Sequence, residues 1–129
     1  MRLDEVLTLT QAELFWPFPT DLCSKTALKR QVCSGFGADL MSDVLRYNVA
    51  QGLLITGLVN PQIVRTAEMA DVTAILMVRG KRPMPETIDV ARQVGIPIIG
   101  TQFTMFETCG HLYAAGLKAA SRHDDPGLD

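Results

Sequence analysis

The sequence predicts an α/β protein in which a mainly parallel sheet lies between two layers of helices. Three consecutive units, at residues 52–70, 73–95 and 96–116, each begin with a short apolar run and continue through a polar turn into a segment of helical periodicity. Strands that alternate with helices of about 10–15 residues form parallel sheets. Right-handed crossovers place helices on both faces of such a sheet, which gives a three-layer α/β/α arrangement.

The length and composition indicate one small globular domain. A chain of 129 residues is near the commonest domain size, and we expect a single α/β domain over residues 1–118 and a polar tail over residues 119–129. The longest uninterrupted apolar run, residues 74–78, is far shorter than the ~20 residues that span a bilayer. We therefore expect no membrane association.

Charge and cysteine content narrow the function classes. Twelve Lys and Arg against fourteen Asp and Glu give a net charge of -2, so the basic excess that nucleic-acid binding requires is missing. The spacings of Cys23, Cys33 and Cys109 fit no compact metal site. Asp4 and Glu5 lie where a secretory signal would need apolar residues. These features favour a cytoplasmic protein with reduced thiols and without a metal or other cofactor.

The first 50 residues give the weaker patterns. A helix is expected from Leu3 until the prolines at positions 17 and 19, and residues 14–18 are compatible with a short edge strand. Residues 20–26 read as a loop, residues 28–35 as a second strand, and Gly35-Phe36-Gly37 as a flexible turn. Asp39 is then the expected N-cap of a helix that runs from residue 40 to about residue 48.

The three main units carry clearer signals. Residues 53–56 are expected to be a central strand, apolar on both faces. Asn60 is a favourable N-cap with Pro61 at the first helical position, and Gly95 is a favourable C-cap for the helix after Pro85. Thr104 and Glu107 have the spacing of a capping box.

The fold class selects one place for a ligand. Ligands of open α/β sheets bind beyond the carboxyl ends of the strands, which here means the loops at residues 56–60, 79–84 and 100–104, and the 35–39 segment could join them. The second loop carries Arg79, Lys81 and Arg82, which suit either a small anion or a solvated loop. A Walker phosphate loop would need Gly at position 75 and Ser or Thr at position 82. The chain has Ile75 and Arg82, so this motif is absent.

The remaining motifs favour structural roles. The pair Asp39 and Asp43 suits helix capping and surface exposure better than Mg²⁺ binding, and Gly35-Phe36-Gly37 is only half of a dinucleotide fingerprint. Cys109 and His111 lie two residues apart on a helix and point in different directions, so they cannot easily share a metal. No set of residues for nucleophilic catalysis stands out. An apolar cluster at the start of the last helix is compatible with base stacking, core packing or a dimer contact; it consists of Phe103, Met105 and Phe106.

Four runs of sequence resemble a known family: GFGADLMSDVL, GLLITGLVNPQIV, AILMVRGKRPMPETIDVARQVGIPIIGT and FETCGHLYAAGL. Over residues 33–117 the chain resembles stand-alone DRTGG-domain proteins, and with them the N-terminal domain of HPr kinase/phosphorylase. The resemblance implies an HPr kinase N-terminal-domain-like fold, a regulatory role and self-pairing as a homodimer. Short members are found beside iron-only hydrogenase components and NADH-oxidising proteins, which implies a redox-related protein partner.

The chain also departs from the family's pattern. Asn60-Pro61 replaces the namesake Asp-Arg, and Val78-Arg79-Gly80 replaces Thr-Gly-Gly. Members are often labelled serine kinases, but without a Walker loop we do not expect kinase activity, and we expect that this protein is not an enzyme.

Two functions fit these observations. The first is a non-catalytic regulatory module that binds a small anionic ligand, such as a nucleotide, through Gly57, Asn60, Arg79, Gly80, Lys81, Thr101 and Thr104. The alternative is a dimeric interaction module that docks on a redox or metabolic enzyme without any ligand. It is motivated by the apolar residues Phe36, Met41, Phe103 and Phe106.

Overall fold

The computed structural model of the chain describes residues 1–122. Within this part, helices surround one five-stranded sheet, and a separate pair of two-residue strands lies beside it. The helices are α1 (Leu3–Thr10), α2 (Cys23–Leu28), α3 (Met41–Arg46), α4 (Pro61–Met69), α5 (Pro85–Val94) and α6 (Met105–Ala114). The strands are β1 (Glu13–Trp16), β2 (Gly35–Gly37), β3 (Tyr47–Asn48), β4 (Leu53–Thr56), β5 (Ala74–Met77), β6 (Ile98–Gly100) and β7 (Ser121–Arg122).

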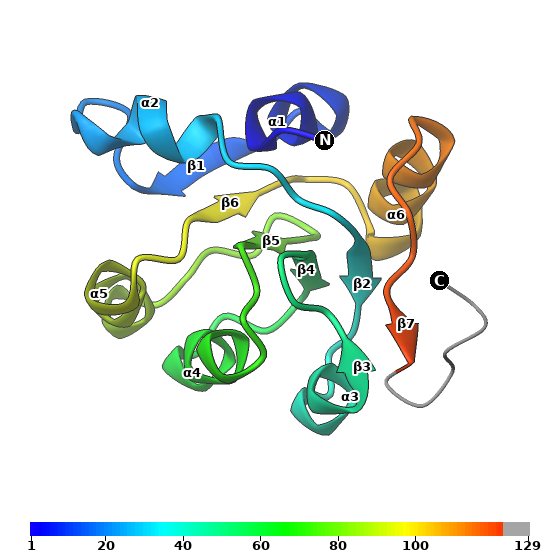
Figure 1. Cartoon of the computed structure of the whole chain (residues 1–129). Coiled ribbons are helices and arrows are strands. Elements are labelled where there is room, and N and C mark those ends of the chain that lie inside the picture. The colour runs from blue at the N-terminus through cyan, green and yellow to red at the C-terminus, as the bar shows by residue number, and fades with distance from the viewer. Residues whose placement is uncertain (123–129) are drawn as a thin grey trace.

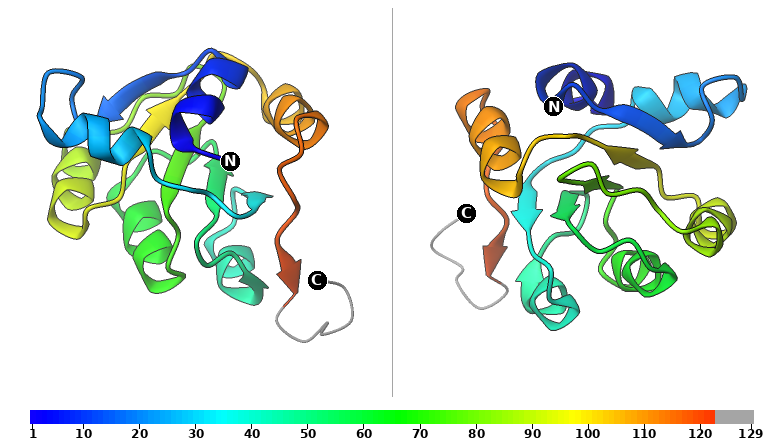
Figure 2. Two further views of the ribbon diagram at one scale, coloured as in Figure 1. Left: turned by 45° about the horizontal axis from the view of Figure 1, so that its top comes forward. Right: turned by 180° about the vertical axis from the view of Figure 1, so that it is seen from behind.

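The main sheet has the strand order β1-β6-β5-β4-β2. Its four strands from β6 to β2 run parallel, and only the edge strand β1 is antiparallel to its neighbour β6. Helices α3, α4 and α5 cover one face of this sheet, while α1 and α6 cover the other (Figures 1 and 2). The predicted three-layer α/β/α fold with a mainly parallel sheet is therefore confirmed.

The core consists of two apolar layers, one on each side of the sheet. Successive residues of the central strands point to opposite faces, so Leu54 joins the layer under α3, α4 and α5, while Leu53 and Ile55 join the layer under α1 and α6. All four residues of β4 and all four of β5 are buried. The expectation that residues 53–56 form a central strand with two buried faces is confirmed.

The predicted caps of the three main helices are also present. The Asn60 side chain accepts a hydrogen bond from the Ile63 amide at 3.2 Å, with Pro61 at the first helical position. Gly95 ends α5 in the left-handed conformation, with φ of 76°. At α6, the Thr104 hydroxyl accepts from the Glu107 amide, and the Glu107 carboxylate accepts from the Thr104 amide at 3.0 Å.

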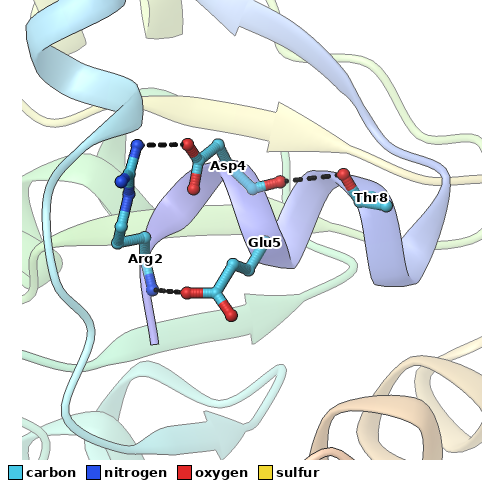
Figure 3. Close-up of polar contacts among 4 residues, drawn as sticks. All are labelled: Arg2, Asp4, Glu5 and Thr8. Carbon is cyan, nitrogen blue, oxygen red and sulfur yellow. Dashed lines mark hydrogen bonds and ion pairs between the residues drawn. The ribbon is translucent and has the colours of Figure 1, made fainter.

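The first helix begins as expected and ends earlier. The Arg2 amide donates to the Glu5 carboxylate at 3.0 Å, and the Arg2 guanidinium donates to Asp4 at 2.6 Å (Figure 3). The helix stops at Thr10 because Gln11 takes a left-handed conformation, with φ of 53°. The chain then turns into the edge strand β1, which corresponds to the strand expected at residues 14–18.

Three expectations for the first half of the chain are wrong. Residues 23–28 form the short helix α2 rather than part of a loop, and they leave no strand over residues 28–35. The Gly35-Phe36-Gly37 segment is the edge strand β2 rather than a turn, because it pairs with β4 over its whole length. Its glycines leave room for the last part of the chain, since a Cβ at Gly35 would lie 2.9 Å from Leu117 Cδ2 and a Cβ at Gly37 would lie 3.3 Å from Cys109 Sγ of α6.

The chain after α6 returns to the main sheet. Gly35 donates to the carbonyl of Lys118 at 2.8 Å and accepts from the Ala120 amide at 3.1 Å. Ser121 and Arg122, where a polar tail was expected, pair with Tyr47 and Asn48, where a helix was expected to continue. Residues 123–129 lie outside the described residues, and the division of the chain after residue 118 stays a prediction. Among residues 1–122, no helix is both long and apolar enough to span a membrane.

Candidate functional site

The three loops selected from the sequence lie at one edge of the sheet. Thr56 pairs with Met77, and Met77 pairs with Gly100, so the carboxyl ends of β4, β5 and β6 are level with one another. Gly57 and Thr101 directly follow β4 and β6, and Arg79 lies two residues after β5. The sheet register brings these loops together.

Arg79 occupies a tight turn in an uncommon backbone conformation. Arg79 and Gly80 have positive φ values of 60° and 68°, and the Lys81 amide donates to the Val78 carbonyl at 3.1 Å. The loop after β6 holds this turn, because the amides of Arg79 and Gly80 donate to the carbonyls of Phe103 and Thr101 at 2.8 and 2.9 Å. A residue other than glycine stores strain of about 1–3 kcal/mol when its φ is positive, and such residues are enriched at ligand-binding positions.

The guanidinium of Arg79 lies against Gly57. A Cβ on Gly57 would collide with Arg79 Nη2, and the same Cβ would lie 3.4 Å from Asp39 Oδ1. A side chain at position 57 would displace the Arg79 guanidinium from this place. Arg79 and Asp39 thus flank one point above the end of β4.

Asp39 has a different role from the one expected. The N-cap of α3 is Leu40 and makes no side-chain cap. Asp39 Oδ1 instead accepts from the Gly57 amide at 2.6 Å and from the Thr56 hydroxyl at 3.2 Å. This carboxylate joins the end of β2 to the end of β4 at the candidate site. Because Asp39 precedes α3, it does not share a helix face with Asp43.

The loop after β5, which we call the basic loop, carries three cations that differ in their contacts: Arg79, Lys81 and Arg82. Arg82 pairs with Glu13 of β1 at 3.1 Å, and its guanidinium carbon lies 4.8 Å from the centre of the Phe15 ring. Over residues 1–122, the side chains of Arg79 and Lys81 make no ion pair within 4.0 Å. Both are exposed. The positive charge available to an anion therefore comes from Arg79 and Lys81.

Most polar side chains of the predicted ligand set are already used within the fold. Thr101 is buried, and its hydroxyl donates to the Thr10 carbonyl at 2.5 Å and accepts from the Phe103 amide at 3.1 Å. Asn60 and Thr104 cap α4 and α6. The amides of Gly57 and Gly80 donate to protein oxygens. An anion at this edge would thus contact side-chain charge, because these backbone amides are already paired.

The cap of α6 leads to a pH prediction. Hydrogen bonds from the backbone and then the side chain of Thr104 lower the pKa of Glu107 below its ordinary value of 4.5, with a smaller contribution from His111. A lowered folded-state pKa stabilises the protein above pH 4.5, and this stabilisation is lost as the pH falls through the folded-state pKa. The difference in unfolding free energy between wild type and Glu107→Gln should therefore shrink on acidification, measured by urea unfolding at neutral and acidic pH. A difference that stays constant across that range would contradict this role of Glu107.

The apolar residues named from the sequence separate into two groups. Phe36, Met41 and Phe103 are half-buried; Phe36 packs on Tyr47 with ring centres 4.7 Å apart, and Phe103 stacks on His111 at 5.1 Å. Phe106 is different, since 88% of it is exposed. It lies at the rim of an apolar cavity of about 500 Å³ between β2 and α6.

The cavity and the basic loop are separate features. Cys109 lines the cavity, and burial raises the pKa of its thiol. Arg79 and Lys81 do not line this cavity, so a ligand bound by them would not occupy it. In the described part of the chain, no group of three or more His, Cys, Asp or Glu side chains could hold a metal ion.

Comparison with known proteins identifies a structure of similar fold. No model of a known protein family matches the sequence, and no curated protein matches it. A similar solved structure contains the CBS and DRTGG domains of the regulatory region of Clostridium perfringens pyrophosphatase, in complex with the activator diadenosine tetraphosphate. The TM-score is 0.61 at 14% sequence identity, and the match covers 95% of this chain and 51% of that one. This chain therefore spans about half the length of its structural neighbour. The similarity shows the fold that the two chains share.

Proposed function

We propose that the protein is a non-catalytic regulatory module that binds a small anionic ligand, such as a nucleotide, at the carboxyl edge of its sheet. The observation that carries this proposal is the pair of exposed cations, Arg79 and Lys81, at the end of the central strand β5. The strained conformation of Arg79 and the bare backbone of Gly57 beneath it support the same position. The phosphate groups of a nucleotide provide the charge and the oxygen acceptors that Arg and Lys recognise.

The structural neighbour gives this proposal a specific first ligand to test. The pyrophosphatase regulatory region is complexed with a dinucleotide activator that carries four phosphates. A ligand held mainly by two exposed cations should bind less tightly at high salt, because ions screen exposed charges over about 8 Å at physiological ionic strength. Salt dependence of the affinity is therefore part of the proposal.

A thermal-shift screen tests the proposal directly. The ligands are adenine and guanine nucleotides, diadenosine tetraphosphate, NADH and inorganic phosphate. A ligand that binds only the folded state adds about 2.7 kcal/mol at a hundredfold excess over Kd, which shifts the Tm of a domain of this size by several degrees. We expect a nucleotide to raise the Tm of the wild type and to do so much less in Arg79→Gln.

Arg82→Gln is the matched control for this screen. It removes the same charge from the same loop, but Arg82 is already paired with Glu13 and packed on Phe15. We expect this variant to respond to the ligand as the wild type does. A ligand shift that Arg79→Gln retains would place the ligand elsewhere, and a screen without any shift would contradict the ligand-binding function.

The alternative function is a dimeric interaction module that docks on a redox or metabolic enzyme, as in a hydrogenase system, and needs no ligand. The exposed apolar surface of α6 favours it, because Phe106 and Tyr113 are 88% and 72% exposed. A screen without any ligand shift, together with a defined complex with such an enzyme, would support this function over the first.

A further inference from the structure

The apolar cavity of about 500 Å³ is enclosed by β2, by α6 and by the segment that follows α6. This segment runs alongside β2 on its way to β7, and Gly35 pairs there with Ala119 (Figure 1). Three buried residues, Ile55, Leu112 and Leu117, line the cavity from the core side. Ligand sites in proteins are typically apolar hollows of about 300–1,000 Å³ with a few polar groups that fix orientation. The size and the lining of this cavity agree with such a site.

The lining selects an uncharged ligand. None of the residues that line the cavity is Asp, Glu, Lys, Arg or His, and three of them are aromatic: Phe36, Phe106 and Tyr113. Burial raises the pKa of the Cys109 thiol, so the surroundings disfavour the charged form of this side chain. A charged ligand would lose hydration here without gaining a partner of opposite charge. A flat, uncharged molecule would instead find apolar contacts and aromatic rings.

The edge strand β2 adds one pair of polar groups to the cavity. The Leu53 amide donates to the Ser34 carbonyl at 2.8 Å, and the Ala38 amide donates to the Ile55 carbonyl at 3.0 Å. In a parallel ladder, every second residue of a strand bonds to the same neighbour. Position 36 therefore bonds to β4, whereas the amide and the carbonyl of Gly37 point away from β4.

Gly37 differs in this respect from the other glycine of β2. Gly35 also points away from β4, and it bonds to the carbonyl of Lys118 and to the amide of Ala120. The backbone groups of Gly37 bond to no other group among residues 1–122. Gly37 lines the cavity, and a Cβ on it would lie 3.3 Å from Cys109 Sγ. The cavity thus has one free backbone donor and one free backbone acceptor at its sheet edge.

We propose that this cavity binds a flat, uncharged small molecule with a hydrogen-bond donor and acceptor side by side on one edge, as in a cyclic amide. Its rings would fill the apolar cavity, and its donor and acceptor would pair with the carbonyl and the amide of Gly37. The two backbone groups exchange hydrogen bonds in the same way with a neighbouring strand. Arg79 and Lys81 do not line the cavity, so this site is independent of the proposed anion site.

Protection of Cys109 from alkylation tests the proposal, with the bicyclic lactam 2-quinolinone as the probe. N-ethylmaleimide is added at mildly alkaline pH, and mass spectrometry follows each cysteine. A Kd at or below about 1 mM leaves at least half of the sites filled at about 1 mM probe, so alkylation of Cys109 should slow at least about twofold. Cys23 and Cys33 are exposed and do not line the cavity, so they serve as internal controls whose rates should not change.

Two comparisons locate the probe. Quinoline has the same bicyclic shape and an acceptor but no donor, so it should protect Cys109 less than 2-quinolinone at equal concentration. Gly110→Leu should abolish the protection, because Gly110 lines the cavity and a leucine there would fill part of it. Leucine is a better helix former than glycine, and no atom lies within 4 Å of a Cβ placed on Gly110, so the fold should be preserved. Ala114→Leu is the matched control, because Ala114 is exposed on α6 and does not line the cavity.

Three results would overturn the proposal. One is a Cys109 that does not react without the probe, since the cavity would then not admit a small flat molecule. Another is a probe that slows all three cysteines equally or none of them. The third is protection that persists in Gly110→Leu. Equal protection by quinoline would overturn the role of Gly37.

Discussion

Arg79→Gly is expected to stabilise the fold and to weaken anion binding at the same time. Arg79 has φ of 60°, which L-residues adopt at a cost of about 1–2 kcal/mol and glycine adopts freely. Part of this gain is offset because glycine is more flexible in the unfolded chain, so a net increase of about 0.5–1 kcal/mol in the free energy of unfolding is expected. Charged hydrogen bonds contribute about 1.5–3 kcal/mol, so the affinity for a nucleotide should fall about tenfold to a hundredfold.

Gln11→Gly is the matched control for the backbone effect. Gln11 is exposed and ends α1 with φ of 53°, so its replacement should give a similar gain in stability. It removes no charge and should leave the affinity unchanged. Chemical denaturation without ligand and calorimetric titration with the nucleotide measure the two effects separately. If Arg79→Gly kept full affinity, the strained conformation of Arg79 would have no connection with ligand binding.

Local signals identified the second half of the fold. Strands such as residues 53–56 are recognisable because buried parallel strands are apolar on both faces, and the caps at Asn60, Gly95 and Thr104 depend only on neighbours within one turn. The first half was harder to predict because its elements depend on distant partners. Gly35 is in a strand because it pairs with Leu53 and bonds to Lys118 and Ala120, and nothing adjacent in sequence encodes these contacts.

The candidate site, too, could be predicted from the sequence only in part. The sheet rule placed Arg79 and Lys81 at the carboxyl edge, since the end of a strand can be located from the sequence. The rule could not show that Arg82 is neutralised by Glu13, sixty-nine residues earlier in the chain. Nor could it show that the Thr101 hydroxyl donates its hydrogen bond to the carbonyl of Thr10. Sequence reasoning thus placed Arg79 and Lys81 at this edge of the sheet, whereas the pairing of each charged side chain depends on tertiary contacts.

The second large effect is expected at Asp39, which the sequence presented as a helix cap. Asp39→Ala would remove the acceptor for the Gly57 amide and for the buried Thr56 hydroxyl, and should lower the free energy of unfolding by about 1–2 kcal/mol. Asp43→Ala is the matched control. Asp43 lies in the first turn of α3, where a carboxylate contributes about 0.3–1 kcal/mol through the helix dipole. Equal losses in urea unfolding would contradict the role of Asp39 as a bridge between β2 and β4.

Asp39→Asn separates the hydrogen bonds of this residue from its charge. The amide oxygen can still accept from Gly57, so most of the stability should remain. The negative charge beside Arg79 would be gone, and removing a like charge that flanks an anion should raise nucleotide affinity about threefold at low salt. The gain should disappear in the Arg79→Gly background if the anion binds at Arg79, because the anion would no longer be held beside Asp39. Titrations of the two single variants and the double variant measure this coupling, and an affinity that does not respond to Asp39→Asn would place the anion away from Gly57.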